Sequence, residues 1–296
     1  MNRWKAELAL GFNPVIWGAT FVLNKGALHG ISPVLFLAMR FTVATAALAV
    51  LFRGRWKGRA GGAPRVTAKR VATAAVIGLL LFAAYVLQTV GLQYTTAPKS
   101  AFLTGLSIVM VPLLAALVYR IRPRIWEVAG VLAATLGMGL MTLEGPIGSI
   151  SRGDLLTLGC AVAFAAHIVA TGHFAGQIGY EVLSFAQAGA AAVAAWSLVR
   201  WVETPRIQWQ PMVVWAILIG GLLCTALAFT IQAWAQRYTT STRTALIYAL
   251  EPVVAWITSY FLAGEGLSGQ AAAGAALILS GVLLVEMKPF QARAHL

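Results

Sequence analysis

Three residues could carry charge deep inside the apolar segments of this sequence, and each suggests a different chemistry. The imidazole of His167 could bind and release a proton near neutral pH. The carboxylate of Glu251 could carry a coupling proton or hold a substrate ammonium group, whereas the guanidinium of Arg40 is better suited to brace helix-end carbonyl groups. For Glu251 a structural role is an equal alternative, because Pro252 removes a helical hydrogen bond and leaves backbone exposed beside it.

Polar and aromatic residues recur around these three at the spacing of a helix face. The sets are Trp17, Thr20 and Asn24; Phe164, His167 and Thr171; Tyr85 and Gln88; Phe229 and Gln232; Ser100, Thr104 and Ser107; and Thr244, Tyr248 and Glu251. Polar groups that face lipid are costly, so we expect these faces to turn inward. A single Ser or Thr could instead bond its own backbone. The predicted small-molecule site consists of Trp17, Asn24, Tyr85, Gln88, Thr104, His167, Phe229, Gln232, Tyr248 and Glu251.

Several kinds of site are missing from the sequence. It has no His-Glu-x-x-His, Gly-x-Ser-x-Gly or Walker motif, so it predicts neither an enzyme with catalytic residues nor a nucleotide-driven pump. Cys160 and Cys224 lack metal-like spacing, and we expect no metal or cofactor. The single aspartate, Asp154, is placed to cap a helix. With Arg40 alone clearly deep, a phosphate site is disfavoured.

The composition is that of an integral membrane protein. Hydrophobic residues make up 59% of the 296 and charged residues only 10%. The net charge of +13 comes from basic residues in short segments between apolar runs, which argues against a nucleic-acid surface. Because a bilayer core needs about 20 apolar residues per helix, we expect an all-α fold of ten spans. They lie near 9–28, 33–51, 71–92, 99–119, 125–143, 154–174, 181–200, 211–236, 243–263 and 270–287.

The distribution of Lys and Arg predicts the orientation of these spans. With the N-terminus inside, the cytoplasmic segments hold sixteen basic residues, whereas the outer segments hold only Arg152, Arg200 and Arg206. Ten spans then return the C-terminus to the cytoplasm. The basic N-terminal stretch is followed by no cleavage pattern, so the first span is expected to be retained.

Two octapeptides in this sequence are nearly the same, YTTAPKSA from Tyr94 and YTTSTRTA from Tyr238. They are 144 positions apart, and each has one basic residue at its sixth position, Lys99 or Arg243. Each is expected to open a span, one at the outer face and one at the inner face. Long basic side chains near span ends can reach the interface, so we predict that Lys25, Lys99 and Arg243 are end anchors.

The similarity extends beyond the octapeptides. At the offset of 144, Tyr85 matches Phe229 and Gln88 matches Gln232, and so do the glycine pairs Gly130 with Gly274 and Gly137 with Gly281. Earlier in each half the offset is 147, which pairs Trp17 with Phe164, Thr20 with His167, Asn24 with Thr171, and Arg40 with Gln187. Each half, residues 1–148 and 149–296, then holds five spans. An odd number inverts the second half in the membrane, as in secondary transporters.

These features resemble the twin EamA repeats of the drug/metabolite transporter superfamily. The resemblance is carried by Trp17-Gly18 with Asn24-Lys25, Arg40-Phe41, the two Tyr-Thr-Thr segments, Glu251-Pro252 and Gly264-Glu265. It covers nearly the whole chain and implies metabolite export through a central cavity walled by spans one, three, four, six, eight and nine. Among characterised relatives, the sequence resembles aromatic amino acid exporters of the YddG type.

Two cargo hypotheses follow. The first is alternating-access export of amino acids with aromatic or other apolar side chains from the inner membrane of a bacterium. The second is proton-coupled export of cationic drugs or guanidinium-like compounds, with Glu251 as the counter-charge. We expect a bilayer-embedded monomer or weak dimer, in which small residues pack spans five and ten closely: Ala129, Ala133, Gly137, Ala276 and Ser280.

Overall fold

The computed structural model describes residues 3–57, 67–95, 97–120, 122–142, 151–263 and 268–287. Within these ranges every secondary-structure element is a helix, apart from one isolated β-bridge between Ile31 and Ile207. The helices are α1 (Arg3–Leu10), α2 (Phe12–Ala27), α3 (Pro33–Lys57), α4 (Ala68–Gly91), α5 (Ala97–Gly105), α6 (Ser107–Tyr119), α7 (Ile125–Thr142), α8 (Arg152–Ile178), α9 (Tyr180–Val202), α10 (Pro211–Gly221), the π-helical turn η1 (Leu222–Leu227), α11 (Ala228–Ala235), α12 (Ser241–Tyr248), α13 (Glu251–Ala263) and α14 (Gly269–Glu286).

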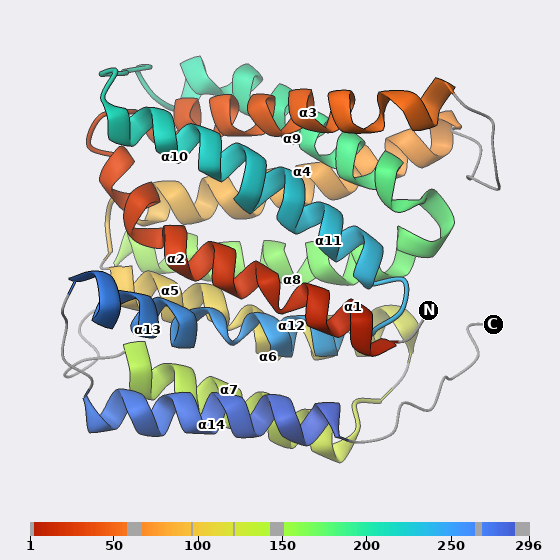
Figure 1. Ribbon diagram of the computed structural model, residues 1–296, viewed down its shortest axis with the longest axis vertical. Coiled ribbons are helices and arrows are strands. Elements are labelled where there is room, and N and C mark those ends of the chain that lie inside the picture. The colour runs from red at the N-terminus through yellow and green to blue at the C-terminus, as the bar shows by residue number, and fades with distance from the viewer. Residues whose placement is uncertain are drawn as a thin grey trace.

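Six stretches of helix in the described ranges are long and apolar enough to cross a bilayer. They are Pro33–Gly54, Ala68–Gly91, Ser100–Tyr119, Arg152–Ile178, Tyr180–Val202 and Pro211–Ala235. The other four expected spans coincide with shorter helices, namely α2, α7, the pair α12 and α13, and α14, so ten crossings stay a prediction. The helices lie side by side, and α1 begins at the end of the bundle where α14 finishes (Figure 1).

Prolines explain two of the interruptions in these helices. α1 ends at Leu10, four residues before Pro14, and α12 ends at Tyr248, four residues before Pro252. A proline ring clashes with the carbonyl group four residues earlier and cannot donate to it, so each helix breaks there. The break between α12 and α13 places Tyr248 and Glu251 at the junction of two half-helices.

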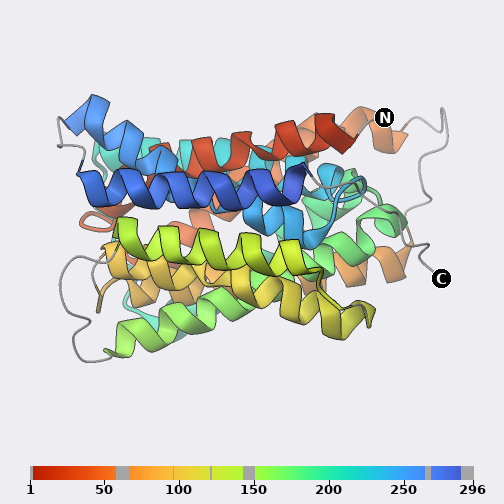
Figure 2. The ribbon, with the colours of Figure 1, turned by 90° about the horizontal axis from the view of Figure 1, so that it is seen from below.

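Helices α7 and α14 contact each other through reciprocal glycine pairs, and both views show them alongside each other (Figures 1 and 2). A Cβ added to Gly130 would lie 2.8 Å from the Gly281 carbonyl oxygen, and one added to Gly281 would lie 2.6 Å from that of Gly130. Gly137 and Gly274 face each other's carbonyl oxygens in the same way. The offset of 144 exchanges these two pairs, as a two-fold axis between antiparallel helices requires.

The expected small-residue contact is therefore present, but part of its predicted composition was wrong. Ala129, Ala276 and Ser280 are exposed on the outer side of the helix pair. The contact instead follows the glycines, because only a residue without a Cβ allows two helix backbones to approach this closely.

We expect Gly137→Ala to destabilise the protein by about 1–3 kcal/mol, because the added methyl group overpacks the contact with Gly274. Thermal unfolding of the detergent-solubilised protein measures this. Gly176→Ala is the matched control: nothing lies within 4 Å of its added Cβ, and alanine is the better helix former. Equal melting temperatures for the two variants would contradict a close α7–α14 contact.

Candidate functional site

Five aromatic side chains from different helices meet in the interior, and we name them the aromatic centre: Trp17, Tyr85, Phe164, Phe229 and Tyr248. The ring centroid of Trp17 lies 4.9 Å from that of Tyr248 and 5.7 Å from that of Phe229. The Tyr85 ring lies 5.4 Å from Phe164 and 6.2 Å from Phe229. The structure therefore brings together four predicted site residues and adds Phe164.

Polar contacts hold these rings in place. The indole of Trp17 donates to the carbonyl oxygen of Cys224 at 3.0 Å, within the π-helical turn. Asn13 donates to the Tyr248 hydroxyl and to the Ala228 carbonyl oxygen, both at 2.9 Å. The sequence interpretation missed Asn13, although it lies one helical turn before Trp17 and so on the same face.

Arg40 is buried beside the aromatic centre, and protein groups accept hydrogen bonds from its Nε and Nη2. Its Nε donates to the Gly220 carbonyl oxygen at 3.1 Å and to Thr225 Oγ1 at 2.8 Å. Its Nη2 donates to the Tyr85 hydroxyl at 2.9 Å, and the guanidinium lies 4.4 Å from the Tyr85 ring centroid. A π-helical turn frees carbonyl groups from the usual ladder, so Arg40 has the bracing role expected for it.

Glu251 differs from Arg40, because the described residues provide no such partners for its carboxylate. It is the first residue of α13, and its backbone carbonyl lies 2.9 Å from the position of a Cβ added to Gly18, the neighbour of Trp17. Its carboxylate is half-buried and within electrostatic range of the Tyr85 hydroxyl. In the described ranges no hydrogen bond or ion pair engages that carboxylate, so the expected contact with backbone beside Pro252 is not formed.

The remaining predicted residues lie to either side of the aromatic centre. Gln88 donates to Thr104 at 3.2 Å, one turn beyond Tyr85 on α4. Asn24 is two turns beyond Trp17, and its buried Oδ1 has no partner in the described chain. Toward the opposite end, Gln232 donates to Gln236 at 2.9 Å.

His167 also lies on that second side. Its Nε2 and Gln187 Oε1 are 3.0 Å apart, and its ring meets the Phe229 ring edge-on at 5.4 Å. Sequence reasoning noted Gln187 only as the counterpart of Arg40, because helical spacing does not reveal contacts between helices.

The two Tyr-Thr-Thr segments make equivalent contacts at opposite ends of the bundle. Thr95 donates to Asp154 at 2.6 Å, and Thr239 donates to Glu7 at 2.8 Å. The threonines are related by the offset of 144 and the acids by the offset of 147. Each half therefore binds the carboxylate near the start of the other half, and we name these contacts the Thr95 latch and the Thr239 latch.

The basic residue of the second octapeptide joins its latch. Arg243 Nη1 lies 3.4 Å from Glu7 Oε1, with side chains 5% and 4% exposed, and Nη2 donates to the Val285 carbonyl oxygen at 2.8 Å. Arg3 pairs with the other Glu7 oxygen at 3.1 Å. The predicted anchor role of Arg243 was wrong, because its side chain is buried against Glu7 and does not reach the membrane interface. The side chains of Lys25 and Lys99 lie outside the described part of the chain.

At the other latch Asp154 has the capping role expected for it. Ser151 and Asp154 form a reciprocal capping box at the start of α8. The same carboxylate thus caps the N-terminus of α8 and accepts a hydrogen bond from the Thr95 hydroxyl.

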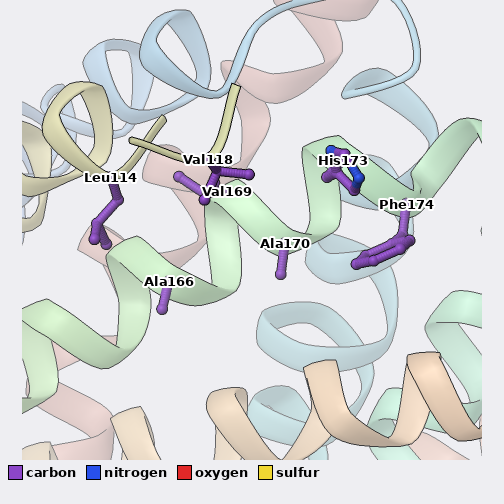
Figure 3. Close-up of a pocket in the computed structure, with 7 residues that line it drawn as sticks. All are labelled: Leu114, Val118, Ala166, Val169, Ala170, His173 and Phe174. Atoms are coloured by element: carbon purple, nitrogen blue, oxygen red, sulfur yellow. The ribbon is translucent and has the colours of Figure 1, made fainter. Parts of the chain in front are cut away.

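A separate cavity of about 320 Å³ lies between α6 and α8. It is lined by Leu114, Val118, Ala166, Val169, Ala170, His173 and Phe174 (Figure 3). This apolar lining contains none of the ten predicted site residues, whose central members are instead packed ring against ring.

Comparisons with known proteins agree with this architecture. The EamA-like transporter family model matches residues 4–143 and again residues 151–287. An "Uncharacterized transporter" of Archaeoglobus fulgidus is 32% identical over 288 residues, covering 97% of this chain and 88% of that protein. "Uncharacterized transporter YyaM" of Bacillus subtilis is 28% identical, covering 93% and 91%.

A solved crystal structure superposes with a TM-score of 0.78 at 20% identity, covering 95% of this chain and 96% of the other, which supports the fold alone. The relatives are named as transporters, which points away from an enzyme. The two family matches together span most of both halves, and the apolar helices are those of a multi-pass membrane protein. The chain therefore belongs to the EamA-like transporter family.

Proposed function

We propose that this transporter exports amino acids with aromatic or other apolar side chains. The observation that carries the proposal is the Glu251 carboxylate beside the aromatic centre, for which the described residues supply no hydrogen bond or ion pair. The carboxylate would hold the ammonium group of the substrate, and the rings would pack against its side chain. The amide groups of Asn24 and Gln88 would orient the substrate backbone.

Alternating access is the mechanism we propose for this export. The two latches close opposite ends with equivalent contacts, so exposing one end at a time requires breaking one latch while keeping the other. The halves that rock would be residues 1–148 and 149–296. Ten spans in a bacterial inner membrane, both termini in the cytoplasm, and a monomer or weak dimer complete the proposal.

The second candidate is proton-coupled export of cationic compounds. It is favoured by Arg40, whose Nε and Nη2 already donate to Gly220, Thr225 and Tyr85 instead of to a substrate carboxylate. A cargo with a positive charge alone would need only Glu251 and the rings.

Counterflow in proteoliposomes separates the two candidates. Labelled phenylalanine should exchange, and phenethylamine, which lacks only the carboxylate, should compete poorly if amino acids are the cargo. Strong competition by phenethylamine and by tetraphenylphosphonium would favour the cationic candidate. Absence of exchange for all amino acids would overturn the first candidate.

Glu251→Gln is expected to reduce exchange about 10- to 100-fold, because a charge-assisted hydrogen bond contributes about 1.5–3 kcal/mol. The measurement is the initial counterflow rate at subsaturating cargo. Glu127→Gln is the matched control, since Glu127 caps α7 by accepting from the Arg124 backbone N–H, far along the chain from the aromatic centre. Equal rates for both variants would remove Glu251 from the site.

A further inference from the structure

A second cluster of polar side chains is buried where α8, α9 and α11 meet. It consists of His167, Thr171, Ser184, Gln187 and Gln232, each at most 1% exposed. Five of their polar atoms have no hydrogen-bond partner in the described chain: His167 Nδ1, Thr171 Oγ1, Ser184 Oγ, Gln187 Nε2 and Gln232 Oε1. Buried polar atoms are nearly always bonded, so a group of five orphans indicates a ligand. We name these five residues the α8–α9 polar cluster.

Apolar side chains close this cluster on two sides. The Phe229 ring covers His167 on the side of the aromatic centre. Ala175, one turn after Thr171, belongs to a buried apolar group with Ile77 and Ile178, and so do Leu183 and Ala233, the chain neighbours of Ser184 and Gln232. Water molecules, each of which can bridge two to four polar groups, would supply the partners that these buried orphan atoms lack.

The corresponding place in the first half is occupied differently. At the offset of 147, His167 and Gln187 correspond to Thr20 and Arg40. Arg40 is permanently charged and donates to the Gly220 carbonyl oxygen and the Tyr85 hydroxyl. Gln187 is neutral, and its Nε2 has no hydrogen-bond partner in the described chain. The first half therefore carries a fixed positive charge where the second half carries an imidazole that can gain one.

We propose that the α8–α9 polar cluster is a hydrated proton-binding site, and that the proton held by His167 is exchanged for cargo during transport. The proton adds to the free lone pair of the neutral imidazole, forming an imidazolium, and leaves to water when the site opens; no other bond changes. The inference rests on the proposed function, because it needs a cargo to exchange against.

The charges around His167 make this exchange physically reasonable. Four ionisable groups on the helices packed against α8 bond to other parts of the protein: Tyr85 to Arg40, Tyr119 to the Val169 carbonyl oxygen, Tyr248 to Asn13, and Arg243 to Glu7. Lys69 and Arg200 lie near the ends of α4 and α9, far along each helix from Tyr85 and Gln187. On α9, Gln187 faces the ring, and Glu181 lies in the first turn with a partner of its own.

The Phe229 ring contacts both His167 and the Trp17 ring of the aromatic centre, so a proton on His167 would lie beside the place proposed for the cargo ammonium group. Charges interact strongly across a low-dielectric interior, so occupancy by one positive group opposes occupancy by the other.

The test measures protons and cargo together. Proteoliposomes containing a pH-sensitive dye are loaded with the cargo identified by counterflow, and the ratio of protons to cargo moved is recorded. The wild type should move protons only with cargo, and His167→Gln should bring the ratio to zero at whatever cargo rate it retains. His173→Gln, on the same helix at the α6–α8 cavity, should keep the wild-type ratio.

A second measurement, made on the wild type, tests the proposal even if the His167→Gln protein does not fold. In ¹⁵N-histidine-labelled wild-type protein in nanodiscs, one buried imidazole signal should titrate with pH and shift when cargo is added. Cargo exchange without proton movement, or a buried imidazole insensitive to both, would overturn the proton site while leaving the proposed function intact. Absence of counterflow in the wild type would instead overturn the proposed function.

Discussion

Glu7→Leu is expected to lower the free energy of unfolding by about 3–5 kcal/mol, the usual cost of leaving a buried charge without its partner. Arg243 would keep the Val285 carbonyl oxygen but lose the Glu7 carboxylate, in a place where the Arg243 side chain is 5% exposed. The Thr239 hydroxyl would lose its acceptor as well. Denaturant or thermal unfolding of the purified protein measures the loss.

The double variant Glu7→Leu with Arg243→Leu separates charge from packing. A buried ion pair can often be replaced by apolar residues at little cost, so the second substitution should restore most of the stability lost in the first. If Glu7→Leu alone unfolds like the wild type, or if the double variant is less stable than both single ones, the pair does not carry the Thr239 latch.

The repeat could be predicted from the sequence because both halves contain the same Tyr-Thr-Thr segment and equivalent glycines. The offset of 144 matched Gly130 with Gly274 and Gly137 with Gly281, and the structure brings these four glycines together in the crossed pairs Gly130–Gly281 and Gly137–Gly274. The partners of the Tyr-Thr-Thr segments were not predicted, since Thr239 and Glu7 are 232 positions apart and meet only because the second half is inverted. A signal was present, however: Glu7 and Asp154 are themselves separated by the offset of 147.

The site was predicted unevenly, for a physical reason. Helical spacing identifies which residues share a face, and it placed Trp17, Tyr85 and Phe229 together. It cannot say which polar groups pair across helices, so Asn13 and Gln187 were missed as partners. It also could not show that Gln88 and Thr104 bond to each other. The depth of Arg243 was misjudged because its position near a span end gave no sign of the buried Glu7.

Arg40→Met should abolish most transport and lower stability, although methionine fills much of the same apolar volume. The Tyr85 hydroxyl, Thr225 and the Gly220 carbonyl oxygen would lose their shared donor. Each buried acceptor left unpaired costs about 1–3 kcal/mol, although Thr225 still donates to Gly220 at 2.8 Å and limits the loss there. Counterflow rate and melting temperature, measured on the same preparation, report the two effects.

Arg40→Lys tests whether charge or geometry matters. Lysine keeps the positive charge but cannot span the π-helical turn and Tyr85 with one planar fork. If Arg40 is a brace, the lysine variant should resemble the methionine variant in transport while losing less stability, because one acceptor can still be satisfied. If charge alone matters, lysine should transport like the wild type. That result would make Arg40 part of the substrate electrostatics, and the amino acid carboxylate would then have a cation to bind.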